Sequence, residues 1–251
     1  MKARRTAKVR PRATAAPKRA KRAKPKLGFS ILDADAHVFE PTVIWQKYVD
    51  RDMRALARAS FYYEDVDGVP SAILHGKPAK PMGTSRINRQ AIWRPGMTPD
   101  EIGALDPACA HPTNPGAADA RARLADMDAL GIDRAIVFPT LFAEYFPAIT
   151  NPDVAHALAR AYNDWIWDHT RRSPRRLLPV AVLPTQDPNL ARKELRRVAK
   201  RGFRFAFLRP AFVGEAFACG DLNDTAGRAR FLNHPAYDAL WADLETLGVV
   251  A

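Results

Sequence analysis

Ile31-Leu32-Asp33-Ala34-Asp35-Ala36-His37 is the stretch that decides the fold. Its two leading apolar residues are typical of the end of a buried strand, and polar side chains follow at alternate positions. Because side chains on a strand alternate between two faces, Asp33, Asp35 and His37 are expected to project the same way. A carboxylate and an imidazole on one face form half of a divalent-metal site. Asp35 and His37 are therefore the predicted metal ligands, with a packed histidine as the competing interpretation of His37, while Asp33 is expected to hydrogen-bond the backbone or to cap.

Length and charge restrict the class of protein. The chain has 251 residues, 47% of them hydrophobic, which allows a sizeable core. A single (β/α)8 barrel uses about 250 residues, so one such domain nearly fills the chain. The formal charge of +12 arises at the amino terminus, because residues 1–26 contain 12 Lys and Arg and no acid. The remainder has 27 basic and 27 acidic residues, so the count does not support a basic nucleic-acid-binding face on the folded part.

Residues 1–27 are predicted to be a basic disordered tail. Two interpretations remain open: a solvated extension, including one left by a start codon placed too early, or an arm that makes weak, salt-sensitive contact with nucleic acid. The two cysteines, Cys109 and Cys219, lie far apart and indicate a reducing, cytoplasmic compartment. No apolar run is long enough to cross a membrane, and the basic tail lacks the apolar segment of a secretory signal.

Residues 28–251 alternate between strand and helix patterns. Helices are expected over residues 120–130, 152–170, 188–200 and 235–247, and strands near residues 29–34, 132–138, 177–183 and 203–208. This α/β alternation implies a parallel sheet with right-handed crossovers. An open four-stranded sheet and an eight-stranded barrel cut near its middle both accommodate it. The barrel fits better, because Val249 follows the helix-closing Gly248 as a new inner strand would.

The pattern breaks down between residues 60 and 116. Two short strands are expected around the turn signal Asp67-Gly68, and many Pro and Gly residues follow. This stretch is too long for an ordinary connection, so it is predicted to be an insertion or lid beside the site.

In barrels, working residues sit at the carboxyl ends of strands. The residues at the four predicted ends are Asp35 and His37, Pro139 and Thr140, Pro184 and Thr185, and Arg209 and Pro210. Arg209 can hold a substrate carboxylate through two hydrogen bonds, or it can form an ion pair at the barrel mouth. The sequence favours neither role.

Several segments, in order, resemble the amidohydrolase-related family. Asp33–Pro41 resembles the opening motif of the branch that includes aminocarboxymuconate-semialdehyde decarboxylase and related aromatic-acid decarboxylases. Arg123–Asp133 with Phe138–Thr140 resembles that family's second strand and the helix before it. Phe207–Pro210 and His234–Trp241 resemble its run towards strand 5.

The resemblance covers residues 29–251 and implies a metal-dependent (β/α)8 barrel, truncated near strand 5. It implies one divalent ion (Zn, Mn or Mg) and the decarboxylation or hydrolysis of a small carboxylated or aromatic substrate, often in a homodimer. Asp35 stands where the family often has His, which favours manganese or magnesium over zinc. The family's later ligands, which follow strands 5, 6 and 8, and its proton carrier are expected to lie beyond Ala251.

The remaining histidines match no ligand position of that family and are expected to be surface or structural residues: His75, His111, His156, His169 and His234. Of these, His111 in the predicted lid is the candidate for substrate contact. The alternative to an enzyme is a catalytically inactive fragment whose basic arm binds nucleic acid or another anionic partner.

Overall fold

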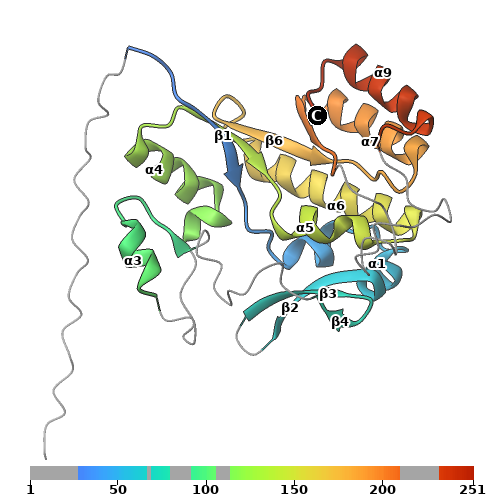
Figure 1. The fold of residues 1–251 in the computed structure, drawn as a ribbon, viewed down its shortest axis with the longest axis horizontal. Helices are drawn as coiled ribbons and strands as arrows, with labels where there is room; N and C mark the ends of the chain where they lie inside the picture. Colours follow the sequence, from blue (N-terminus) through green and yellow to red (C-terminus); the bar gives the residue numbers. More distant parts are fainter. Residues whose placement is uncertain (1–27, 67–68, 80–91, 106–113, 210–231) are drawn as a thin grey trace, which may run out of the picture.

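The structure is a computed structural model that describes residues 28–66, 69–79, 92–105, 114–209 and 232–251. Its main sheet has four parallel strands in the order β1 (Leu32–His37), β5 (Arg134–Phe138), β6 (Leu177–Val182) and β7 (Phe205–Phe207) (Figure 1). Val250 continues this order, because it pairs in parallel with Phe205 of β7. Strands that follow one another in the sequence are therefore neighbours in space, as in a barrel. The predicted fold, part of a (β/α)8 barrel, is confirmed.

The helices that connect and follow these strands are α4 (Ala120–Leu130), α6 (Pro152–Thr170), α7 (Pro188–Lys200) and α9 (Asp238–Leu247). The first three begin where Asp119, Asn151 and Asp187 accept hydrogen bonds from backbone N–H groups of the first turn. Helices α4 and α9 end at Gly131 and Gly248, whose φ values of 76° and 61° suit glycine. No helix in the described ranges has the length and apolar character needed to span a membrane.

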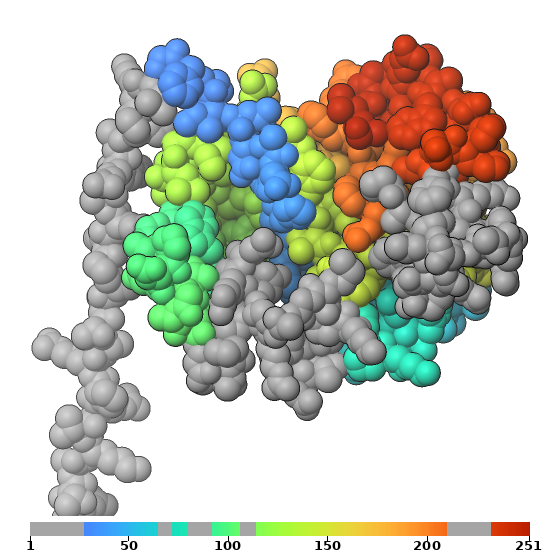
Figure 2. Space-filling model, in the orientation of Figure 1, coloured from blue at the N-terminus to red at the C-terminus, as the bar shows by residue number. Residues whose placement is uncertain are grey.

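Strand β1 starts later than predicted and contains Asp35 and His37 instead of ending before them. The prediction of a strand over 29–34 was wrong because it relied on apolar residues to mark the strand. β1 lies at the edge of the sheet, where polar side chains can remain exposed to water. The blue residues that include β1 lie uncovered on the face shown in Figure 2. The pairing with β5 also shifts register between Asp33 and Ala36, so the regular alternation of faces is interrupted there.

The described part of the predicted insertion contains a small antiparallel sheet. It consists of β2 (Phe61–Val66), β3 (Val69–Leu74) and β4 (Lys77–Pro78), so the two short strands around Asp67-Gly68 are confirmed. The 3-10 turn Pro235–Tyr237 and the π-helical turn Ile44–Tyr48 are also present, and Pro235–Tyr237 lies at the start of the helix predicted over 235–247. Several other short elements were not predicted: α1 (Arg54–Ser60), α3 (Pro99–Gly103), α5 (Leu141–Tyr145) and the 3-10 turns Pro115–Ala117 and Phe146–Ala148. The lid role of residues 60–116 stays a prediction, and the basic tail, residues 1–27, lies outside the described residues.

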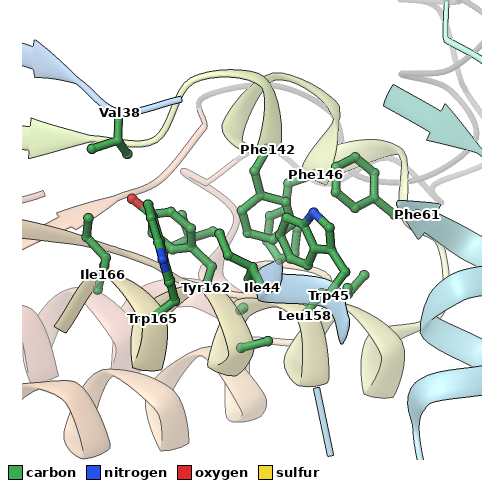
Figure 3. Close-up of a cluster of buried hydrophobic side chains, with 14 of the residues drawn as sticks. Val38, Ile44, Trp45, Phe61, Phe142, Phe146, Leu158, Tyr162, Trp165 and Ile166 are labelled. Carbon is green, nitrogen blue, oxygen red and sulfur yellow. The ribbon is translucent and has the colours of Figure 1, made fainter. Parts of the chain in front are cut away.

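An aromatic cluster lies behind the ends of β1 and β5. Trp45, Phe142 and Phe146 lie between Phe61 and Tyr162 of α6 in Figure 3. The ring centroids of Trp45 lie 5.1 Å from Phe61 and 4.8 Å from Phe142. Because these rings come from the segments that follow β1 and β5, their packing anchors both segments to α6. A second, smaller core joins α7 to α9.

Candidate metal centre

Asp35 and His37 point toward one another from the exposed edge of β1. The Nε2 atom of His37 lies 3.2 Å from Oδ1 of Asp35, and the two side chains are 44% and 88% exposed. The structure thus brings the two predicted ligands together on one side of the strand. Two donor atoms that bind one ion at about 2.1 Å each lie roughly 3–3.4 Å apart. The separation in β1 suits a shared cation.

The hydrogen bonds of His37 show what this pair needs. Nδ1 lies 2.8 Å from the carbonyl oxygen of Pro139 and donates to it, because a carbonyl can only accept. In a neutral imidazole the lone pair of Nε2 then faces Oδ1 of Asp35, which is another acceptor. Two facing acceptors require a proton or a metal ion between them. The donor set of one imidazole and one carboxylate fits a divalent metal.

Asp33 has a different role from the other two polar residues of β1. Its Oδ1 accepts a hydrogen bond from the backbone N–H of Asp35 at 3.0 Å. This bond occupies the carboxylate and supports the backbone at the register shift. The expectation that Asp33 bonds the backbone is confirmed.

Pro139 and Thr140, which follow β5, hold His37 from the neighbouring strand. Besides the Pro139 carbonyl, the hydroxyl of Thr140 lies 3.4 Å from Nδ1 of His37 and donates to the carbonyl oxygen of Val38 at 2.6 Å. Parallel neighbours end at the same edge of a sheet, so the end of β5 is in place to orient a side chain at the end of β1.

Glu40 is a buried carboxylate next to this segment. It is 1% exposed, and its Oε1 accepts from the backbone N–H groups of Thr140 at 2.6 Å and Phe142 at 3.3 Å. Burial raises the pKa of Glu40 to about 7, against backbone hydrogen bonds that lower it. Sequence reasoning gave Glu40 no role. A single acid within the apolar run from Val38 to Trp45 was the signal that could have found it.

Arg123 braces the end of β1 from helix α4. Its Nη2 donates to the carbonyl oxygen of His37, while its Nε is buried without a hydrogen-bond partner in the described structure. Burial lowers the pKa of Arg123, and the nearby carboxylates of Asp33 and Asp126 oppose this shift. The sequence identified Arg123 only as the first residue of a family-like segment, because a contact across 86 positions leaves no local pattern.

A hollow of about 390 Å³ opens beside the pair. It is lined by residues of β1, α4 and the two segments on either side of the undescribed residues 106–113, among them Asp35, His37, Trp93, Asn114, Arg123 and Thr140. Polar and aromatic side chains together around a candidate metal pair are suited to a small polar ligand.

Arg209 lies near the carboxylate of Glu144 in α5. Burial raises the pKa of Glu144, and the charge of Arg209 lowers it, so the two groups interact electrostatically. Of the two roles left open by the sequence, this electrostatic interaction is compatible with an ion pair at the strand ends. Substrate binding by Arg209 stays a prediction.

The other candidate histidines have structural contacts or lie outside the described residues. Nε2 of His75 is 3.4 Å from the Ala148 carbonyl, Nε2 of His156 is 3.9 Å from Glu194, and Nδ1 of His234 accepts from a backbone N–H. His111 lies outside the described residues, so its substrate contact stays a prediction. Among the described residues, no group of three or more His, Cys, Asp or Glu side chains could hold a metal ion.

The chain is similar to known proteins over most of its folded part. The family model described as amidohydrolase matches residues 33–251. The γ-resorcylate decarboxylase of Rhizobium radiobacter is 34% identical over 128 residues, which is 51% of this chain and 36% of that protein. The chain therefore matches little more than a third of that relative's length.

Solved structures give partial matches. An amidohydrolase from Mycobacterium avium subsp. paratuberculosis K-10 has a TM-score of 0.63 and 22% identity, over 89% of this chain and 57% of that chain. A dihydroxybenzoic acid decarboxylase from Polaromonas sp. JS666, solved with manganese and the inhibitor 2-nitroresorcinol, has a TM-score of 0.47 and 19% identity, over 88% of this chain and 47% of that chain.

Proposed function

The chain belongs to the amidohydrolase family, and from this premise we propose that Asp35 and His37 help to hold a divalent metal ion in a decarboxylase of small aromatic carboxylic acids. One observation carries the proposal: Nδ1 of His37 donates to Pro139, which turns Nε2 as an acceptor towards Asp35 at 3.2 Å. Curated relatives named γ-resorcylate decarboxylase support this reaction over hydrolysis.

The ligand atoms favour particular ions. A carboxylate oxygen beside an imidazole nitrogen favours manganese or magnesium. A pair of imidazoles at the same positions would favour zinc. The described residues supply these two ligands, and a complete centre needs others from outside them. A bound divalent ion would supply Lewis-acid chemistry at the carboxylate of the substrate.

The chain's own residues bind and orient. Pro139 and Thr140 orient the imidazole ring of His37, which lines the hollow, so that Nε2 faces Asp35. We assign Arg209 to a second anionic group of the substrate, for which Glu144 is the competing partner. His111 remains the candidate for a further substrate contact.

Metal titration tests the proposal. Mn²⁺ binding to the 251-residue chain, followed by electron paramagnetic resonance, is expected to weaken by at least about tenfold in Asp35→Asn and in His37→Gln, since each removes one of two ligands. Asp153→Asn, an exposed carboxylate in the first turn of α6, is the matched control and should bind as the wild type does. Equal Mn²⁺ affinity in all four proteins would refute the metal site.

A substrate assay separates the two chemistries. With γ-resorcylate as the probe, the proposal requires release of carbon dioxide by the protein with Mn²⁺. Hydrolysis of an ester or amide probe without any release of carbon dioxide from γ-resorcylate would overturn the decarboxylase assignment in favour of a hydrolase.

A further inference from the structure

Burying the carboxylate of Glu40 costs free energy, and the proposed metal site gives this residue no role. A carboxylate that is 1% exposed loses its hydration, and its described partners are backbone N–H groups. Its second oxygen, Oε2, has no hydrogen-bond partner in the described structure. An apolar residue of similar size would avoid this cost.

One peptide group joins Glu40 to His37. The N–H of Thr140 donates to Oε1 of Glu40 at 2.6 Å. The carbonyl oxygen of Pro139, in the same peptide group, accepts from Nδ1 of His37 at 2.8 Å. Both bonds are short, and a peptide whose N–H is bound by a carboxylate carries more negative charge on its carbonyl oxygen. The Glu40–peptide–His37 link thus connects a buried carboxylate to a candidate metal ligand through a planar, rigid unit.

We propose that Glu40 is a positioning residue for His37, which acts through the Pro139–Thr140 peptide to fix the protonated Nδ1 and direct the lone pair of Nε2 towards the cation. The metal part of this inference rests on the proposed function. In metal sites a carboxylate commonly accepts the second N–H of a ligating histidine directly, which fixes the tautomer and makes the ligand more basic. Here the carboxylate has the same effect from one peptide further away.

Further hydrogen bonds of Glu40 and Thr140 join the two segments that flank His37. Oε1 also accepts from the N–H of Phe142 at 3.3 Å, so Glu40 holds the start of α5. The hydroxyl of Thr140 bonds the carbonyl of Val38 at 2.6 Å. The segment after β1 and the segment after β5 are therefore held together next to His37.

Magnetic resonance of the imidazole rings tests the link without metal. In the metal-free wild type, a two-dimensional ¹H–¹⁵N spectrum is expected to show His37 with a protonated, strongly hydrogen-bonded Nδ1. Glu40→Met removes the acceptor at similar volume and is expected to shift or lose that signal. It should also weaken Mn²⁺ binding by about 10–100-fold, the usual cost of removing a residue that orients a metal ligand.

Two further variants keep the result decisive. Asp187→Ala removes the cap of α7, lowers stability, and should leave the His37 signal and Mn²⁺ affinity unchanged. Glu40→Gln keeps an acceptor oxygen and is expected to restore affinity to within about tenfold of wild type, since a neutral acceptor polarises the peptide less. If Glu40→Met does not fold, Glu40→Gln decides, because its weaker acceptor must move the Nδ1 proton signal upfield.

The proposal is overturned if the folded Glu40 variants keep the wild-type His37 signal, or if Asp187→Ala lowers Mn²⁺ affinity as much as Glu40→Met does. A wild type that binds no Mn²⁺ would refute the metal site alone, since the metal-free spectra still establish or reject the link between Glu40 and His37.

Discussion

Asn163 of α6 binds both backbone groups of Val182, the last residue of β6. Its Nδ2 donates to the Val182 carbonyl at 2.9 Å and its Oδ1 accepts from the Val182 N–H at 2.8 Å. Nδ2 also donates to Oε1 of Glu194 at 2.7 Å, and two nitrogens of Arg197 donate to the same carboxylate. Asn163 and Glu194 are fully buried, so this network fixes the end of β6 to α6 and α7.

Replacing Asn163 is expected to destabilise the fold strongly. Asn163→Leu leaves both backbone groups of Val182 without their side-chain partner and removes a donor from Glu194. Unsatisfied buried polar groups cost about 1–3 kcal/mol each, so the free energy of unfolding should fall by about 3 kcal/mol or more. Urea unfolding measures the change. Asn189→Ala, at an exposed position of α7, serves as the control and should stay within about 0.5 kcal/mol of wild type.

The buried carboxylate of Glu40 predicts that stability falls as pH rises. Its pKa is about 7 in the folded protein, above the ordinary value of 4.5 for a glutamic acid, so the folded state binds the proton more tightly. The stabilisation is complete below pH 4.5 and is lost as pH rises through about 7. A shift of this size corresponds to about 3 kcal/mol. The difference in unfolding free energy between wild type and Glu40→Gln, measured from pH 4.5 to 8, should show this slope, and parallel curves would contradict it.

Periodic segments were predictable because their signals are local. The helix over residues 188–200 has the predicted bounds, with Asp187 as its cap and Pro188 in its first turn. The strands after α4 and α6 lie within one or two residues of their predicted bounds, since apolar runs mark strands buried on both faces. The family match over residues 33–251 confirms the resemblance drawn from the motif that begins at Asp33.

The supports of the candidate site were not predictable, because each joins distant segments. His37 meets Pro139 across 102 positions, Thr140 meets Glu40 across 100, and no periodicity encodes such contacts. The facing of Asp35 and His37 was expected from strand alternation, although β1 begins later than predicted and its alternation is interrupted between Asp33 and Ala36. Short elements such as α5 escaped detection because five residues provide little more than one turn of pattern.

Two glycines predict opposite effects of one substitution. Gly131 ends α4 with φ of 76°, where an alanine side chain is strained. Gly131→Ala should therefore lower the free energy of unfolding by about 1–2 kcal/mol. Gly103, at the end of α3, lacks a positive φ and has open space around the added carbon. Gly103→Ala should change stability little or raise it by up to about 1 kcal/mol. Thermal unfolding of both variants checks the pair, and equal losses would show that the glycine conformation is not the cause.

His169 predicts a pH dependence of the opposite sign to that of Glu40. Burial, and then the charge of Arg123, lower the pKa of His169 to about 4 from the ordinary value of 6.5 for a histidine, although Asp119 opposes the shift. The neutral ring packs on Trp165 with centroids 5.1 Å apart, so the folded state disfavours the charged form.

The stability that His169 contributes is therefore present above pH 6.5 and is lost as pH falls towards 4. His169→Phe keeps the ring contact without a titrating group. As pH falls from 6.5 to 4, the unfolding free energy of His169→Phe should rise relative to that of wild type by up to about 3 kcal/mol. Partial exposure of the His169 ring makes the expected change smaller. Because carboxylates titrate alike in both proteins, the difference isolates His169, and a gap that is constant from pH 7 to 4 would contradict its burial as a neutral ring.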